Sequence, residues 1–200
     1  MDAVFPASNR LGIPDLDPAQ QPDCLHLPVW AWGSVGRSRR HNGTWHCYVE
    51  DGRFARLVRE PDALVATGCA AAVEPNISVF DDTPPALAHA TIYRKRWVAR
   101  YWQTCGVKVW VDLNLPARLL DGDEWAMGIP PGWRAFATRG YDRRVSDLDR
   151  EYAAARSIAE RPLFLVVGGG RQVADWCGGR PGVLHSCYRA DRRVYRDGQG

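Results

Sequence analysis

Hydrophobic positions follow three successive patterns between residues 70 and 114. Residues 70–76, which begin with four apolar residues and end in polar ones, predict a strand. Apolar positions three and four residues apart then predict a long helix from Pro84 to Cys105, and the apolar run 107–114 predicts a second strand. A strand, a long helix and another strand favour a parallel pair of strands joined by a right-handed crossover.

The long helix carries its own start and stop signals. Thr83 can cap the amide groups of the first turn, and Pro84 suits the first helical position. Gly106 suits the left-handed backbone conformation in which many helices end. The side of the helix that we expect to be buried holds the residues Leu87, Ala90, Val98, Tyr101, Trp102 and Cys105.

Shorter segments repeat the alternation of strand and helix on both sides of this unit. About seven strands, most of them separated by helices, predict an α/β domain of βα repeats. We expect a mostly parallel sheet with a barrel-like or incomplete TIM-type closure. Two alternatives remain: an open doubly wound sheet, and a hairpin between the first two strands, which the turn signal Asn42-Gly43 favours. The other predicted strands are 26–32, 45–50, 133–138, 162–167 and 182–188, and the other main helices are 53–59 and 145–158.

Composition divides the 200 residues into three parts. Residues 1–25 read as an extended N-terminal arm, 26–188 as a single α/β domain and 189–200 as a basic tail. No apolar run is long enough to span a bilayer, and the N-terminus does not resemble a secretory signal. We therefore expect a cytoplasmic protein. The net charge of +3 is too small to indicate nucleic acid by itself.

Carboxylates stand where several predicted strands end. Glu50 and Asp51 follow one strand, Glu74 ends the next and Asp112 ends a third. Parallel α/β sheets bind their ligands at this edge, so we interpret these four residues as candidate catalytic groups. Glu50, Asp51 and Asp112 could also hold a divalent metal such as Mg²⁺. The competing interpretation is that all four only end strands or cap helices.

Amides, a hydroxyl, a glycine turn and arginines supply candidates for substrate binding. A glycine loop before a helix can hold an anion, and arginines that alternate with aromatic rings can bind phosphates and stack bases. A solvated helix face whose rings belong to the core is the competing interpretation of those arginines. The candidates are Asn76, Ser78 and Asn114 at or near strand ends, Arg139, Gly169 in the glycine turn 168–170, and Arg94, Arg96 and Arg100 of the long helix.

The six cysteines include three that stand beside histidines, as Cys24 with His26, His46 with Cys47 and His185 with Cys187. Brought together, such pairs could bind zinc, but their spacing is not a recognised zinc pattern. Buried free thiols and strand histidines are the interpretation we favour.

Five stretches carry a family resemblance: 45–54 (WHCYVEDGRF), 73–80 (VEPNISVF), 83–87 (TPPAL), the helix 92–103 with its Tyr-Arg-x-Arg-Trp core and Gly106, and 128–132 (GIPPG) with Arg139-Gly140. They resemble the DUF4417 family of uncharacterised bacterial and phage proteins, over roughly residues 28 to 170. That family often has Pro-Asp where this chain has Pro75-Asn76. The resemblance implies phages or mobile elements in a bacterial host cell as the setting, and it brings no activity.

Three classes of function fit these observations. The first is a phage or mobile-element protein that binds or acts on DNA or RNA, with a metal at the carboxylates and phosphates at the arginines of the long helix. The second is an enzyme for a small molecule or nucleotide in the barrel mouth, with Glu74 or Asp112 as general base and an anion at Arg139 or the glycine turn. The third is a non-catalytic protein that binds a host or phage protein through surface tryptophans.

Overall fold

The strands of the computed structural model pair in sequence order, so that each strand lies beside the next one along the chain. The model describes residues 4–33 and 42–187, and the predicted basic tail and most of the loop after the first strand lie outside them. All six described strand pairs are parallel. The strands are β1 (Val29–Ala31), β2 (Thr44–His46), β3 (Ala71–Val73), β4 (Lys108–Asp112), β5 (Ala135–Arg139), β6 (Leu163–Val167) and β7 (Val183–Ser186).

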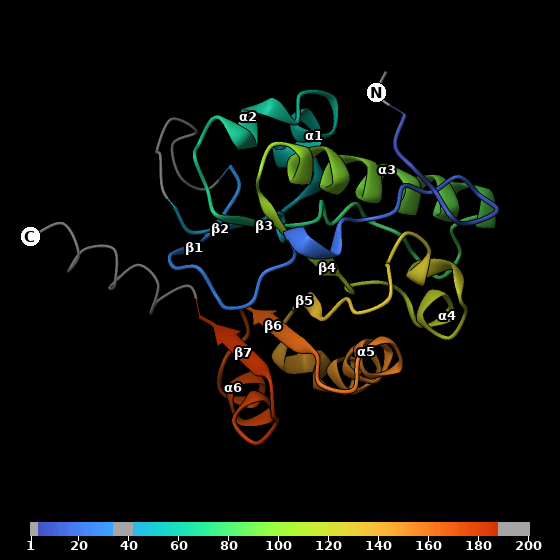
Figure 1. Ribbon diagram of the computed structural model, residues 1–200. Coiled ribbons are helices and arrows are strands. Elements are labelled where there is room, and N and C mark those ends of the chain that lie inside the picture. Colours follow the sequence, from blue (N-terminus) through green and yellow to red (C-terminus); the bar gives the residue numbers. More distant parts are fainter. Residues whose placement is uncertain (1–3, 34–41, 188–200) are drawn as a thin grey trace, which may run out of the picture.

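Helices separate most of these strands and cover the outer side of the sheet, which curls into a half-barrel with β1 and β7 at its two edges (Figure 1). Among the described residues, no helix is both long and apolar enough to cross a membrane. The α-helices are α1 (Asp51–Arg59), α2 (Asp62–Val65), α3 (Pro85–Thr104), α4 (Ala117–Leu120), α5 (Val145–Ile158) and α6 (Arg171–Cys177), and the 3-10 helices are η1 (Pro18–Gln20), η2 (Glu124–Ala126) and η3 (Asp142–Arg144).

This strand order decides between the architectures that the sequence left open. A doubly wound sheet reverses its strand order at a switch point, and a sheet in sequence order from β1 to β7 has none. The predicted barrel-like α/β fold is therefore confirmed, as is the parallel pair β3–α3–β4. The hairpin alternative is wrong, because Val29 pairs with Thr44 in parallel. Twelve residues separate β1 from β2, which is enough chain for a crossover.

The core is thickest around the central strands, whose apolar runs are covered on both sides. Strands β4, β5 and β6 are buried along almost their whole length. Large aromatic side chains fill the core, among them Trp45, Trp102, Trp110 and Trp133, all 1% exposed or less. These tryptophans belong to the core rather than to a binding surface.

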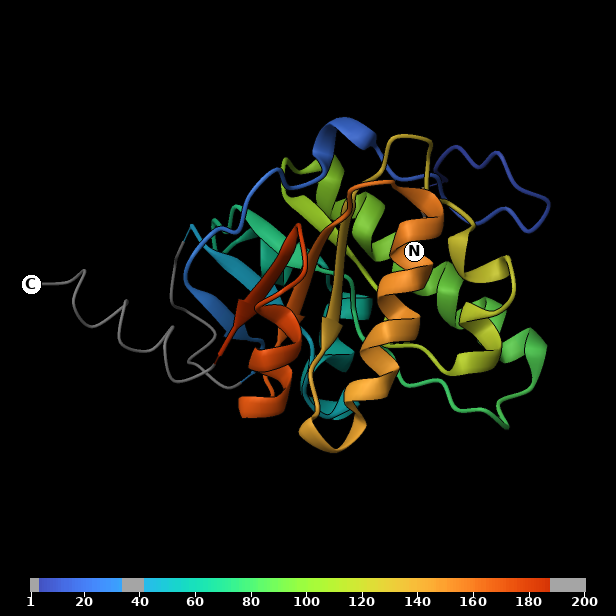
Figure 2. The same ribbon diagram turned by 90° about the horizontal axis from the view of Figure 1, so that it is seen from below.

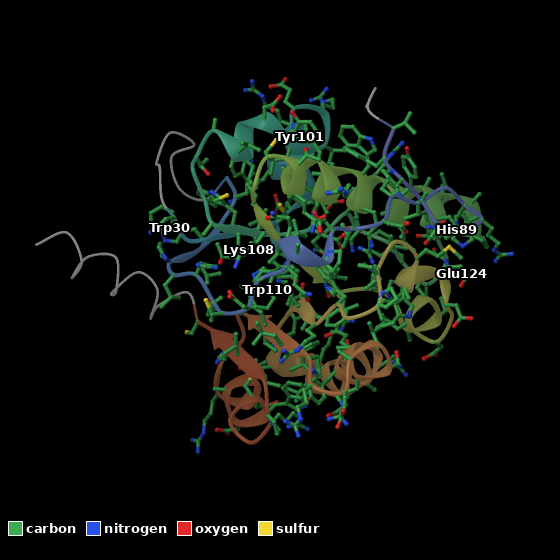
Figure 3. The ribbon with its side chains drawn as sticks, in the orientation of Figure 1. Trp30, His89, Tyr101, Lys108, Trp110 and Glu124 are labelled. Atoms are coloured by element: carbon green, nitrogen blue, oxygen red, sulfur yellow. The ribbon has the colours of Figure 1, made fainter. Side chains whose placement is uncertain are left out.

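Helix α3 begins and ends within one residue of its expected bounds, but two details differ. Thr83 does not cap it: the Thr83 hydroxyl accepts a hydrogen bond from the Phe80 amide, and Pro84 occupies the cap position. The predicted buried side is rotated, since Leu87 is 59% exposed. The buried side includes Lys95 and Arg96. Because these two residues are charged, the sequence did not identify their side of the helix as the buried one. At its outer side His89 approaches Glu124 of η2, at 4.0 Å (Figure 3).

The N-terminal arm crosses the amino ends of the strands. Figure 2 shows it along the opposite edge from the loops that follow β5 and β6. The arm is anchored by Ile13 and Leu16, which are buried, and by the Gln103 side chain, which bonds the backbone of Asp17. At the start of β4, Lys108 lies 3.1 Å from Asp23 (Figure 3). The arm thus covers the amino end of the half-barrel, and the described arm residues leave the carboxyl ends open.

Candidate functional site

A cavity of about 680 Å³ lies at the carboxyl ends of β2 to β5. Loops that follow four neighbouring strands supply its walls, as expected for a ligand site in a barrel of parallel strands. Six of the residues proposed from the sequence come together there. They are Glu50, Asp51, Asn76, Ser78, Asn114 and Arg139.

Glu74, in contrast, lies beneath the cavity in an ion pair with Arg96 of α3. Neither side chain is more than 2% exposed. The Arg96 guanidinium also donates to the carbonyls of Trp125 at 2.8 Å and Met127 at 3.2 Å. One Glu74 oxygen accepts from the Asp112 backbone amide at 3.1 Å. Both charges are therefore satisfied inside the protein, so their contacts are those of a structural pair.

Asp112 forms a second buried ion pair, with Lys95, one residue before Arg96. The Lys95 ammonium lies 2.7 Å from one Asp112 oxygen. The other oxygen accepts from the Tyr48 hydroxyl and from the Asn114 backbone amide, both at 3.0 Å. Burial, with the nearby Asp112 carboxylate, raises the pKa of Tyr48, so this phenol stays protonated as a donor. The Asp112 oxygens thus all have partners in the protein.

These buried pairs position the amides at the cavity. Asp112 fixes the backbone of Asn114, and the Asn114 side-chain amide donates to the Asn76 side-chain oxygen at 3.1 Å. Because Asn76 and Asn114 follow neighbouring strands, the bond ties two strand ends together. The remaining donor and acceptor atoms of the two side chains are available to a ligand.

The predicted metal ligands Glu50, Asp51 and Asp112 do not converge. Asp51 accepts with both oxygens from Ser78, through its amide and its hydroxyl, each at 3.0 Å. In the part of the chain that the structure describes, these three carboxylates do not place three oxygens within 4.8 Å of one another. The group that does is Asp23, Cys24 and His26, shortly before β1 at the other end of the sheet.

Arg139 ends β5 and lines the cavity, half-buried. Its guanidinium lies 4.7 Å from the ring centre of Tyr141, a cation–π contact. Among the described residues, no carboxylate lies within 4.0 Å of it. The positive charge of Arg139 also acts on His46 of β2. Burial and, to a smaller extent, the Arg139 guanidinium lower the pKa of His46 to about 3. The cavity thus contains a cation without an ion pair among the described residues. Five carboxylates also line the cavity, and they are Glu50, Asp51, Asp81, Asp147 and Glu151.

Glu151 of α5 also lines the cavity, and sequence reasoning missed it. Its side chain is only 4% exposed. The Thr138 hydroxyl donates to one of its oxygens at 2.7 Å. Burial raises the pKa of Glu151 well above that of an ordinary glutamate. A signal was present: Glu151 comes three residues after Leu148 and four before Ala155, so it lies on the same side of the helix as these two buried residues.

The three arginines of α3 do not form one basic face. Arg94 is exposed, while Arg96 is buried against Glu74. Arg100 is half-buried, 3.9 Å from Asp17 of the arm. The prediction of a shared phosphate-binding face therefore needs correction at Arg96, because a phosphate cannot reach a side chain inside the core.

Gly169 takes a left-handed backbone, with φ of 79°, in the turn before α6. The amides that follow it already have an acceptor. Gly170 and Val173 donate to the same Asp142 oxygen, at 2.8 and 3.2 Å. The chain's own carboxylate thus stands where we expected an external anion.

Comparison with known proteins places the chain in a family. The model of DUF4417, a domain of unknown function, matches residues 5–133. The "Gene 1 protein" of Mycobacterium phage D29 is 32% identical over 112 residues, which are 53% of this chain and 40% of that protein. The "Gene 1 protein" of Mycobacterium phage L5 is 31% identical over 112 residues, 53% of this chain and 47% of the relative.

The match therefore spans less than half the length of either phage protein. No solved structure matches the chain. The family model covers well over half of the chain, including β1 to β4 and the two buried ion pairs. The chain belongs to the DUF4417 family and is related to proteins of mycobacteriophages.

Proposed function

We propose that this protein acts on a small polar molecule that carries an anionic group, held in the cavity at the carboxyl ends of β2 to β5. The observation that carries the proposal is Arg139, a cation that lines the cavity without a carboxylate partner in the described chain. A guanidinium binds phosphate or carboxylate with two parallel hydrogen bonds.

Size and lining support a small ligand. A volume of about 680 Å³ lies in the range of roughly 300–1,000 Å³ that is usual for small-molecule sites. Asn76 and Asn114 offer directional hydrogen bonds from the ends of β3 and β4, and Arg139 and Tyr141 lie at the end of β5 and just after it. Because carboxylates line the cavity as well, it suits a polar ligand that carries hydrogen-bond donors beside its anionic group.

A nucleic-acid substrate has weaker support. The basic stripe of α3 is interrupted, since Arg96 is buried and Arg100 lies beside Asp17. The carboxylates proposed for a metal are separately engaged, Asp51 by Ser78 and Asp112 by Lys95. A nucleotide or another phosphate-bearing small molecule combines two of the three classes of function. It carries phosphate, as DNA and RNA do, and it has the size of a small-molecule ligand for the cavity.

Calorimetric titration with phosphate, citrate and AMP as probes tests the proposal. Arg139→Gln removes the cation, and Arg143→Gln is a matched control, because Arg143 is exposed and does not line the cavity. Binding that is lost only in Arg139→Gln supports the proposal. Absence of binding by all three probes in the unmodified protein would overturn it.

A further inference from the structure

Glu151 is a buried carboxyl group at the wall of the cavity that the anion-binding proposal does not use. It is fixed at one oxygen by the Thr138 hydroxyl, at 2.7 Å. No cation of the described residues lies within 4.0 Å of it. A carboxyl group that is almost fully buried and lacks a cation costs much free energy when it is charged, and is rarely retained for stability alone.

The position of Glu151 relative to Arg139 is set by β5. Thr138, which holds the carboxyl group, directly precedes Arg139 in that strand. Both Glu151 and Arg139 line the same cavity. Neighbouring residues of a strand point to opposite faces of the sheet, so the side chains of Thr138 and Arg139 diverge. A ligand whose anionic group binds Arg139 reaches Glu151 by extending along the cavity past the end of β5.

The surroundings of Glu151 suit both of its protonation states. Burial favours the protonated acid, and so do the negative charges of Asp112 on β4 and Asp147 on α5. The Thr138 hydroxyl and the Arg144 guanidinium act in the opposite direction and favour the carboxylate. The Tyr48 phenol, also nearby, is protonated and neutral. Burial thus favours the acid that could donate a proton, and the Thr138 hydroxyl and the Arg144 guanidinium favour the carboxylate that such a donation leaves.

We propose that Glu151 is the general acid and base of the cavity, for a substrate that presents an anionic group to Arg139 and a basic oxygen or nitrogen to Glu151. This inference rests on the proposed function. In the forward step, the O–H bond of Glu151 breaks and an O–H or N–H bond forms on the substrate atom. The electron pair stays on the Glu151 oxygen, and the Thr138 hydroxyl donates to the new carboxylate. The reverse transfer restores the acid.

Proton exchange on ligand binding tests this role. An anion bound at Arg139 makes ionisation of Glu151 less favourable, so binding takes up a proton at any pH where Glu151 is partly ionised. The measurement is titration with AMP in buffers of different ionisation enthalpy, between about pH 5 and about pH 9. The comparison is between the unmodified protein, Glu151→Gln and Glu160→Gln, an exposed acid outside the cavity lining.

We expect proton uptake by Glu151 in the unmodified protein and in Glu160→Gln. In Glu151→Gln only the exchange of the AMP phosphate itself, whose second pKa is about 6, should remain. Thr138→Val provides a second variant that leaves the acid in place. It removes the hydroxyl that stabilises the carboxylate, so uptake should begin at a higher pH.

Unchanged proton exchange in Glu151→Gln would overturn the role of Glu151 while leaving the anion site intact. If Glu151→Gln does not fold, an unchanged pH dependence in Thr138→Val overturns it. Absence of AMP, phosphate and citrate binding in the unmodified protein overturns both proposals together. The two failures are thus distinguishable.

Discussion

The Lys95 ammonium lies 2.7 Å from Asp112, and both side chains are at most 2% exposed. This pair joins the middle of α3 to the end of β4 directly below the cavity. Because Asp112 also fixes Asn114, the ion pair supports the site without lining it. Its role is to position the cavity amides.

Loss of the Lys95 charge should destabilise the protein strongly. Lys95→Met leaves the Asp112 carboxylate buried without a cation, and breaking such a pair costs roughly 3–5 kcal/mol of unfolding free energy. Arg94→Met, at the exposed neighbouring position, should change it by no more than about 0.5 kcal/mol. Urea denaturation measures both. Equal stabilities for the two variants would show that the buried pair contributes little.

The pair of Glu74 and Arg96 should behave as a unit. Arg96→Met alone leaves Glu74 as an unpaired buried charge and should cost roughly 3–5 kcal/mol. The double variant Glu74→Leu with Arg96→Met removes both charges and should be more stable than Arg96→Met alone. Chemical denaturation of the unmodified protein, of Glu74→Leu, of Arg96→Met and of the double variant completes the cycle. A double variant that loses the sum of the single losses would mean that the two groups act independently.

Acid should destabilise the protein through His46. Its pKa in the folded protein is about 3, against an ordinary value of 6.5. Between these values the unfolded chain binds a proton that the folded protein does not, so the unfolding free energy falls as the pH falls from about 6.5 towards about 3. The expected loss is on the order of 4 kcal/mol.

His46→Gln should flatten this acid limb of the stability curve, which denaturation at a series of pH values measures. His89→Gln is the control, because His89 lies at the outer side of α3 with 30% of its side chain exposed. An acid limb that is equally steep in His46→Gln and in the unmodified protein would assign the effect to other groups.

The sequence was sufficient for the order of elements and for the parallel β3–α3–β4 unit. The left-handed Gly106 and the apolar runs of the strands are local signals, and the structure keeps both. Strand ends that carry Asn76, Asn114 and Arg139 could be placed at one edge because parallel strands align their carboxyl ends.

What could not be predicted depends on partners far apart in the sequence. Lys95 and Arg96 look like surface residues until Asp112 and Glu74 are known to lie opposite them. Because Glu74 and Asp112 are engaged in these pairs, they do not line the cavity, although they stand at strand ends as Asn114 does. Glu151 lies on the buried side of its helix, but the partner that holds its carboxyl group, Thr138, belongs to another element, β5.

The measurement that tests the anion site most directly is calorimetric binding of phosphate, citrate and AMP to Arg139→Gln, beside the unmodified protein and Arg143→Gln. Loss of a charge-assisted hydrogen-bond partner costs about 1.5–3 kcal/mol, so we expect at least one probe to bind Arg139→Gln roughly ten- to a hundredfold more weakly, with Arg143→Gln unchanged. All three proteins should have the same unfolding free energy within about 0.5 kcal/mol. Equal affinity of the three proteins for every probe that binds would contradict an anion site at Arg139.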